Sequence, residues 1–240
     1  MKALTPAELA LLPDKCKQDP RVVDLYLQHD FATAYAMHTD LRVQENGYKA
    51  AIGNDQDWEL EGEKQFRFLL DAGLRPGDTL LEVGCGTGRL ARKICPFLEV
   101  GGYVGMDISK TALMALHSLS CLEGWNYKSP TMWYELPLAP EHFPPPFSMV
   151  FAFSVFIHCP LAMVRETLGT CARVMQPGAS FYFSYVPENA SARTGLKQFR
   201  HTKADYREAV EAAGLVWMGT MAGWPGPQSM ARADKPLVLR

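Results

Sequence analysis

Residues 80–91 read LLEVGCGTGRLA, an apolar stretch that contains one acid, followed by three glycines at alternate positions. Gly84, Gly86 and Gly88 let the backbone turn sharply and approach a ligand with no Cβ in the way. The helix expected after them would present free N–H groups to that ligand. The segment therefore predicts a buried strand, a ligand-binding turn and a helix, although a strand-to-helix turn without a ligand also fits the glycines alone.

Two residues of this segment argue against a dinucleotide fingerprint. Arg89 stands five positions after Gly84, where the GxGxxG pattern requires a small residue. Glu82 lies beside the loop, where a carboxylate would repel a pyrophosphate but suit a ligand with a cationic amine. A nicotinamide-dependent oxidoreductase is thus the disfavoured alternative, and the loop favours a cofactor with a positive end.

Asp107 ends the next apolar stretch, YVGMDIS at residues 103–109. It lies 23 positions after Gly84, close to the spacing of roughly 20 that places the second strand beside the first. A carboxylate there can accept both hydroxyls of a ribose. The alternative is an acid that only complements a helix N-terminus.

From about residue 74 onward, short apolar stretches alternate with segments of helical period, which predicts βαβ units. Seven strands are expected, at residues 80–83, 103–106, 131–135, 147–153, 181–185, 215–218 and 237–239. Helices are expected after the N-caps Ser109 and Thr202, and from residue 161 to a stop at Pro177-Gly178. We therefore predict an α/β fold with a doubly wound, mostly parallel, seven-stranded sheet.

The first 73 residues carry a different pattern. Thr5 and Glu8 match a capping box, and Pro20 begins one helix whose apolar positions continue to His38. A polar, glycine-containing stretch follows at residues 44–57, before a further helix that leads into the first strand.

This segment is too short for an independent enzyme, whereas the rest of the chain is about right for one doubly wound domain. We expect residues 1–73 to form a helical lid or substrate-recognition segment and residues 74–240 to form the cofactor-binding domain. Tyr48 lies in the polar stretch, which would suit a mobile lid.

Composition and net charge argue against several classes of binding partner. The chain has 240 residues, 48% of them hydrophobic, and a formal net charge of −2, so no overall field would hold a nucleic acid or an anionic membrane. The six cysteines form no CxxC pair, which predicts neither a disulfide framework nor a metal site and favours a cytoplasmic location. The apolar residues 147–159 are too few for the ~20 that a membrane-spanning helix needs.

Four features in order resemble class I S-adenosylmethionine-dependent methyltransferases: the glycine loop, Asp107, FSMVFAFSVFIHCP at residues 147–160 and RVMQPGASFYFSY at residues 173–185. The likeness covers about residues 62–240. It implies a Rossmann-like fold, S-adenosyl-L-methionine as cofactor and S-adenosyl-L-homocysteine as product. It also implies which residues bind the cofactor: Glu82, Gly84, Cys85, Gly86, Gly88, Asp107, Ile108 and Ser154.

The roles within this set also follow from the resemblance. The acid equivalent to Glu82 and the glycine loop hold the methionine moiety, the acid equivalent to Asp107 binds the ribose, and the residue at Ile108 packs on the adenine.

Three positions depart from the family pattern. Ser148 stands where the family usually has Asp before the fourth strand. The residue that reads the adenine amine stays open among Trp133, Tyr134 and Glu135. The fourth strand ends in Ala-Phe-Ser at 152–154 and not in the D/N-P-P-Y of methyltransferases that act on nucleobases, which lowers the nucleic-acid option further.

His158 is the candidate general base, because it follows the fourth strand on the face where such sheets bind ligands. Its alternative is a structural role as a cap or core residue. The candidate substrate contacts are Tyr48, Trp58, Tyr185 and Trp224, although aromatics are more often core packing.

The sequence thus predicts methyl transfer to an O, N or C nucleophile of a small molecule by a monomer or homodimer. The alternative is a protein that binds the cofactor but catalyses a non-methyl reaction or serves as a non-catalytic partner subunit.

Overall fold

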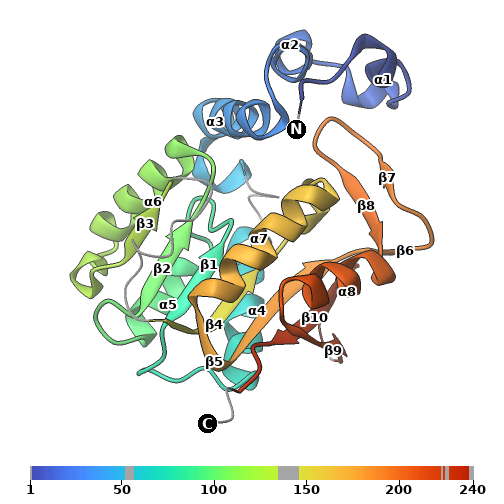
Figure 1. Ribbon diagram of the computed structural model, residues 1–240. Helices are drawn as coiled ribbons and strands as arrows, with labels where there is room; N and C mark the ends of the chain where they lie inside the picture. Colours follow the sequence, from blue (N-terminus) through green and yellow to red (C-terminus); the bar gives the residue numbers. More distant parts are fainter. Residues whose placement is uncertain (1, 52–56, 135–145, 223, 225–226, 238–240) are drawn as a thin grey trace.

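A computed structural model describes residues 2–51, 57–134, 146–222, 224 and 227–237. Its centre is a seven-stranded sheet in the order β3-β2-β1-β4-β5-β10-β9 (Figure 1). The strands are β1 Leu80–Val83, β2 Tyr103–Met106, β3 Thr131–Trp133, β4 Phe147–Ala152, β5 Met175–Tyr185, β9 Val216–Met221 and β10 Ser229–Asp234. Only β10 runs antiparallel to its neighbours, so the predicted mostly parallel, doubly wound sheet is confirmed.

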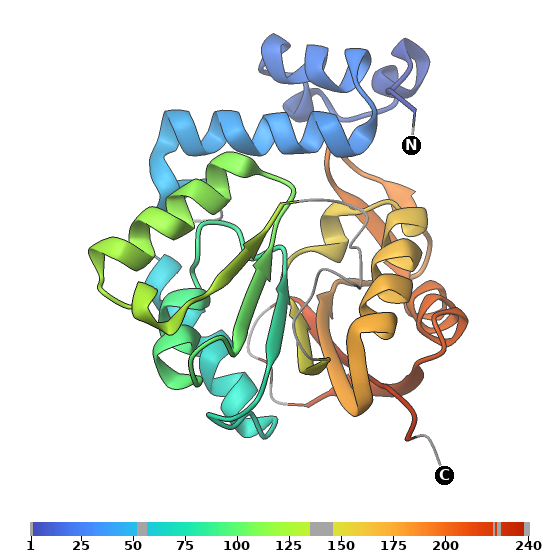
Figure 2. The ribbon, with the colours of Figure 1, turned by 60° about the vertical axis from the view of Figure 1, so that its left-hand side comes forward.

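Helices cover both faces of this sheet (Figure 2). One face carries α4 Trp58–Asp71, α5 Ala91–Phe97 and α6 Lys110–Leu122, and the other carries α7 Leu161–Val174 and α8 Lys203–Ala212. Successive strand residues point to opposite faces. Leu80 and Phe151 join the apolar cluster under α4–α6, whereas Leu81 and Val150 join the cluster under α7 and α8. Both faces are therefore buried, which explains the strands' lack of polar alternation.

The N-terminal segment forms α1 Pro6–Ala10, the 3-10 turn η1 Asp14–Cys16, α2 Pro20–Gln28 and α3 Phe31–Ala50. The capping box of Thr5 and Glu8 is present. The single helix expected from Pro20 to His38 is wrong. The chain is extended at His29, and the Asp30 side chain accepts the N–H groups of the following turn, so a second helix begins there.

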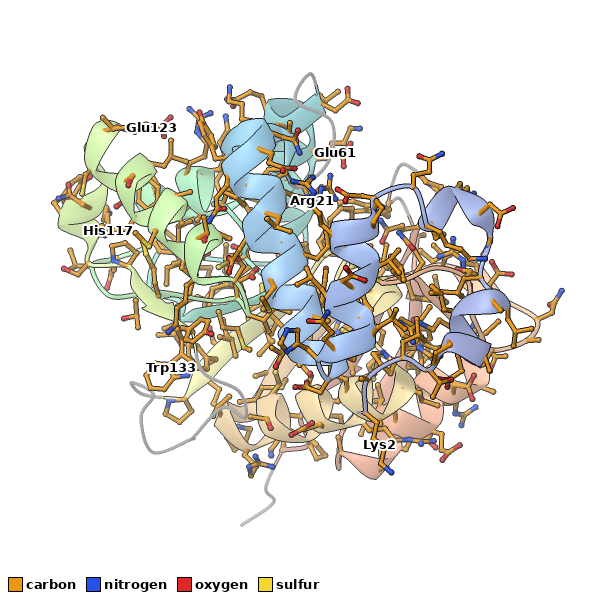
Figure 3. All side chains as sticks on the ribbon, turned by 90° about the horizontal axis from the view of Figure 1, so that it is seen from above. Lys2, Arg21, Glu61, His117, Glu123 and Trp133 are labelled. Atoms are coloured by element: carbon orange, nitrogen blue, oxygen red, sulfur yellow. The ribbon has the colours of Figure 1, made fainter. Side chains whose placement is uncertain are left out.

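Helix α3 crosses the carboxyl-end edge of the sheet, beside α6 (Figures 2 and 3). The Asp40 carboxylate accepts hydrogen bonds from the Ser109 hydroxyl at 2.5 Å and the Thr111 N–H at 3.1 Å, which fastens α3 to the start of α6. Arg21 of α2 points toward α3 and pairs with Glu45 (Figure 3). The cover over the sheet is thus held by specific polar contacts.

A small second sheet supports this cover from the other side. It consists of β6 Pro187–Glu188, β8 Phe199–Thr202 and β7 Ala192–Arg193, in the order β6-β8-β7. Phe31 packs edge-on against Phe199 with ring centroids 5.2 Å apart. The start of β8 therefore lies next to the start of α3, although the two are far apart in the sequence.

Some predicted boundaries are wrong. The last strand is β10 and not residues 237–239, since Leu237 lies outside any strand and is 71% exposed; residues 238–239 lie outside the described residues. β10 reads SMARAD, and alanine has a low strand propensity, so only its place between β5 and β9 makes it a strand. The polar residues 44–50 continue α3, although Gly47 interrupts its helical conformation with a φ of 77°.

The Pro177-Gly178 pair does not end a helix. α7 ends at Val174 and β5 follows without a loop, so the pair lies inside the strand as an irregularity in its pairing with β4. Pro177 has no N–H to donate, and Gly178 adopts a φ of 83°. Within the described part of the chain, no helix has both the length and the apolar character needed to cross a membrane.

Candidate active site

A cavity of about 360 Å³ lies where β1, β2 and β4 end, beneath α3. The chain segments that surround it come from the glycine loop, the end of β2, the end of β4, α3, α7 and the loop before β8. Its wall includes Tyr35, Thr39, Arg42, Ala51, Gln65, Glu82, Val83, Gly84, Cys85, Gly86, Arg89, Met106, Asp107, Ile108, Phe153, Ser154, Val155, His158, Cys159, Met163, Thr167, Lys197 and Gln198.

The glycine loop turns as the sequence requires. Gly84, Gly86 and Gly88 all have positive φ, at 68°, 54° and 95°. A Cβ on Gly84 would come within 2.4 Å of the Val155 side chain, so this position leaves no room for another residue. Gly88 instead faces Leu116 of α6, where a Cβ would come within 2.3 Å. Gly84 and Gly86 therefore line the cavity, whereas Gly88 lets α6 approach the loop.

Glu82 lies at the end of β1 and is buried. Burial raises the pKa of its carboxyl to about 7, while the hydroxyl of Tyr103, which donates a 2.6 Å hydrogen bond to it, and the charge of Arg89 act in the opposite direction. Because burial disfavours the ionised form of Glu82, a cationic partner would stabilise that form strongly. The site therefore suits an ammonium group at Glu82.

Asp107 follows β2, and its two carboxylate oxygens accept the backbone N–H of Gly86 at 2.8 Å and of Ser109 at 2.9 Å. Burial raises the pKa of this carboxyl, and the backbone hydrogen bonds counteract that shift. The two carboxylate oxygens offer about four lone pairs, more than the backbone N–H groups of Gly86, Ser109 and Ile108 fill. The glycine loop thus fixes the position of Asp107. Its carboxylate can still accept hydrogen bonds from the hydroxyl groups of a ligand in the cavity.

Two further polar side chains also line the cavity. Gln65 of α4 is buried, and its amide nitrogen has no hydrogen-bond partner among the described residues. Arg89 is half-buried, its charge acts on the Glu82 carboxyl, and its guanidinium lies 5.6 Å from the ring centroid of Phe153. An acid, a cation and an unsatisfied amide donor around a glycine loop fit the ammonium and carboxylate of an amino-acid moiety, which S-adenosylmethionine carries.

The other cofactor candidates also line this cavity. Cys85 and Ile108 face it from the loop and from the residue after Asp107. Ser154 has a φ of 58°, rare for a residue other than glycine, and its N–H donates to the Ser184 hydroxyl at 2.7 Å. A hydrogen bond to β5 therefore stabilises the strained backbone at the end of β4.

His158 ends the short turn η5 Phe156–His158 and faces the same cavity. Its Nδ1 lies 2.9 Å from the carbonyl oxygen of Lys197, and because a carbonyl only accepts, Nδ1 carries the proton. Burial, together with the charge of Lys197, lowers the pKa of the imidazole to about 4. The ring is therefore neutral at pH 7, with the lone pair on Nε2 available.

The four candidate substrate residues do not line the cavity. Trp58 is buried in the sheet core, and Tyr48 packs against it with ring centroids 5.6 Å apart. Tyr185 is buried on the face of the sheet that α8 covers, and its hydroxyl lies 2.7 Å from the hydroxyl of Thr220. Trp224 packs 4.8 Å from Phe153, which does line the cavity. The backbone carbonyl of Tyr48 accepts a 2.6 Å hydrogen bond from Thr87, so its position matters to the glycine loop.

Ser148 takes part in hydrogen bonding although it replaces the usual acid. Its hydroxyl donates to Asp78 at 3.0 Å and accepts the N–H of Thr79 at 3.1 Å. Ser148 therefore connects β4 to the residues before β1 by hydrogen bonds, even without the usual acid. Of the candidates to read the adenine amine, Glu135 lies outside the described residues.

Sequence reasoning missed several residues of the cavity wall. No motif indicates a role for Thr39, Arg42, Lys197 or Gln198, whereas Tyr35 is one of the aromatic residues that the sequence offers as possible pocket contacts. Thr39 and Arg42 lie on one helix, and Lys197 and Gln198 are adjacent, but the two pairs are far apart in the chain and no local motif surrounds either pair. Their only signal is the fold itself, which brings α3 and the loop before β8 to the end of β4.

Comparison with known proteins agrees with this geometry. A methyltransferase-domain model matches residues 81–181. The ubiquinone biosynthesis O-methyltransferase of Thiobacillus denitrificans is 30% identical over 174 residues, which are 68% of this chain and 71% of the relative.

Two solved structures share the fold. The magnesium protoporphyrin IX methyltransferase of Synechocystis PCC 6803, solved with bound S-adenosylmethionine, superposes with a TM-score of 0.62 at 16% identity, over 86% of this chain and 97% of that one. The mitomycin 7-O-methyltransferase superposes with a TM-score of 0.65 at 14% identity, over 89% of this chain and 62% of that one.

The fold and the cavity therefore define an enzyme of the Rossmann-like type that uses S-adenosylmethionine. The chain belongs to the class I S-adenosylmethionine-dependent methyltransferases.

Proposed function

We propose that this methyltransferase transfers the methyl group to an O, N or C nucleophile of a small molecule bound beneath α3. The observation that carries this proposal is that both groups of residues line one cavity. We assign Glu82 and Asp107 to a cofactor half of it, and His158 and Tyr35 to an acceptor half. The curated relative and both solved neighbours are named as methyltransferases of small molecules, which supports the same substrate class.

When bound, S-adenosylmethionine supplies an activated methyl group on a sulfonium. The protein's own task is mainly to align the acceptor with that group, and such positioning can lower the barrier by roughly 7–11 kcal/mol. We assign the cofactor half to Glu82, Gly84, Gly86 and Asp107, with Cys85, Ile108 and Ser154 in contact and Gly88 supporting the loop.

We propose His158 as the general base. Nε2 would take the proton of the acceptor while Nδ1 remains bonded to the Lys197 carbonyl, and this proton transfer is worth about 10²- to 10⁴-fold in rate. A low pKa makes the imidazole a weak base, so it suits an acceptor whose own proton is acidic. The neighbouring ring of Tyr35, with its centroid 5.8 Å away, would orient the imidazole.

We also propose that residues 1–73 control access to the acceptor, with α3 as the cover. Tyr35, Thr39 and Arg42 would contact the acceptor directly. Tyr48, Trp58, Tyr185 and Trp224 stay predictions as substrate contacts, and their packing suggests support of the walls instead. A cytoplasmic monomer or homodimer, without nucleic-acid or membrane partners, completes the proposal, and the six free thiols agree with a reducing compartment.

A screen with isotopically labelled S-adenosylmethionine and a panel of metabolite fractions tests the proposal. We expect the label to appear in a low-mass product, and the yield to fall when Asp107 is replaced by alanine. If cofactor binds tightly but no fraction, protein or nucleic acid accepts the label, the alternative of a non-methyl reaction or a partner subunit replaces the proposal.

A further inference from the structure

Two cationic side chains line the same cavity as the candidate cofactor residues. Arg42 comes from α3 and Lys197 from the segment between β7 and β8. The guanidinium of Arg42 donates to the carbonyl of Ala50 at 3.3 Å, and the Lys197 ammonium lies 5.3 Å from the ring centroid of Tyr35. Among the residues that the structure describes, no carboxylate lies within 4.0 Å of either cation.

The surroundings leave this positive charge uncompensated. Burial, together with the charge of Arg42, lowers the pKa of Lys197 to about 7. Burial and the charges of Lys197 and Arg42 also lower the pKa of His38 to about 3. Both side chains are half-buried, and a cation that is partly withdrawn from water without an anion is unfavourable, so this pair gains when an anion enters.

The acids of the neighbouring cavity have other partners. The same two cations line a second cavity of about 760 Å³ toward α2, where Asp19 and Glu45 also contribute to the wall. Both of these carboxylates are paired with Arg21, at 2.7 Å each. Asp19 and Glu45 are therefore not free to compensate the two cations, which leaves room for the anion of a ligand.

The carboxylate of the cofactor is one source of this anion, but the electrostatic neighbours of the two cations disfavour it. Arg89 is the cation whose charge acts on the pKa of Glu82, which places it at the ammonium and carboxylate end. Arg42 and Lys197 instead act on the imidazole of His158. The two cations thus belong to the acceptor half.

We propose that Arg42 and Lys197 form an anion-binding subsite and that the methyl acceptor is a small carboxylic acid, held there while its nucleophile faces His158. The inference rests on the proposed function and names its substrate class. An arginine and a lysine that converge on one space are a common arrangement for holding a carboxylate. Gln198, which lines both cavities, adds an amide beside them.

Calorimetry on the protein saturated with S-adenosylhomocysteine tests this subsite. The probes are matched pairs of an acid and its amide: 3,4-dihydroxybenzoate with 3,4-dihydroxybenzamide, and phenylacetate with phenylacetamide. We expect the acid of at least one pair to bind tenfold or more tightly than its amide. The preference should disappear in Lys197→Met and Arg42→Gln and return in the conservative Lys197→Arg and Arg42→Lys.

The matched control is Arg207→Gln, because Arg207 is an exposed cation on α8 that pairs with Glu211. It should keep the preference, and the Kd for S-adenosylhomocysteine should stay within twofold in every variant. Equal binding of acid and amide, no binding by any acid, or a preference that survives in both charge-removing variants would overturn the subsite. So would a loss of S-adenosylhomocysteine affinity in those variants. Acid binding without any methyl transfer in the labelled screen would instead contradict the proposed function.

Discussion

The carboxylate of Asp40 in α3 accepts a hydrogen bond of 2.5 Å from the hydroxyl of Ser109, two residues after the candidate ribose-binding acid Asp107. The same carboxylate oxygen accepts the N–H of Thr111. The cover of the acceptor half is therefore joined to the loop that bears the cofactor half. We therefore expect cofactor binding and the position of α3 to be coupled through these contacts.

Replacing Asp40 by alanine should loosen α3 without removing the cofactor site. Loss of two hydrogen bonds to a carboxylate is worth about 1–3 kcal/mol of stability. We expect faster limited proteolysis of residues 40–57, weaker protection by S-adenosylmethionine and a raised KM for the acceptor. Asp24→Ala, an exposed acid on α2, is the control and should change none of these. Unchanged proteolysis in Asp40→Ala would show that the two hydrogen bonds of Asp40 do not hold α3 in position.

Cofactor affinity should depend on pH through Glu82. The folded pKa of about 7 lies above the ordinary value of 4.5, so the carboxyl is neutral in acid and ionised above pH 7. Because the ionised form attracts an ammonium group, affinity for S-adenosylmethionine should fall as the pH drops from 8 to 5.5. Calorimetry over this range should show a pH-independent, weaker affinity in Glu82→Gln, and wild-type behaviour in the exposed control Glu166→Gln.

The same shift has an opposite consequence for the free protein. A raised folded pKa means that the stability contributed by Glu82 is complete below pH 4.5 and is lost as the pH rises through 7. Thermal unfolding without cofactor should therefore show a smaller loss of Tm between pH 5 and 8 in Glu82→Gln than in the wild type. An equal loss in both proteins would mean that Glu82 is not the responsible group.

Gly84→Ala separates steric exclusion from backbone strain. The new Cβ would meet Val155 at 2.4 Å and would also sit at a φ of 68°. We expect at least a tenfold loss of S-adenosylmethionine affinity and a stability loss of about 1–3 kcal/mol. Gly73→Ala has a φ of 98° but no atom within 4 Å of the new Cβ, so it should cost only the strain and leave affinity intact. Equal effects of the two variants would contradict the proposed close packing.

His158→Gln should lower the rate of methyl transfer by about 10²- to 10⁴-fold while the Kd for S-adenosylmethionine stays unchanged. Because burial lowers the pKa of His158 to about 4, the wild-type rate at saturating substrates should not titrate with this group between pH 5 and 8. His117→Gln, an exposed histidine on α6, is the matched control. A variant that keeps the wild-type rate would assign His158 a structural role.

The cofactor half could be predicted from the sequence because its residues are near neighbours in the chain. Glu82 and the glycines lie in one strand-turn-helix segment, and Asp107 ends the next strand, so local pattern and spacing were enough. The acceptor half lacked such a pattern. Arg42 and Lys197 are separated by 155 positions and meet only because the loop before β8 packs beside α3.

The wrong boundaries have the same physical origin. Ala231 and Ala233 are poor strand residues, and β10 exists only because β5 and β9 offer hydrogen bonds on both sides. The break at Asp30 depends on a side-chain cap that competes with an uninterrupted apolar helix face. Tertiary pairing and capping decide these elements, while apolar periodicity decided the rest.

The central claim is that donor and acceptor meet in one cavity beneath α3. A crystal structure with S-adenosylhomocysteine and the acceptor found in the labelled screen tests it most directly. We predict the ribose hydroxyls at Asp107, the amino group at Glu82, and the methyl-accepting atom facing Nε2 of His158. An acceptor bound instead in the second cavity toward α2, or a cofactor bound away from Glu82 and Asp107, would contradict the account.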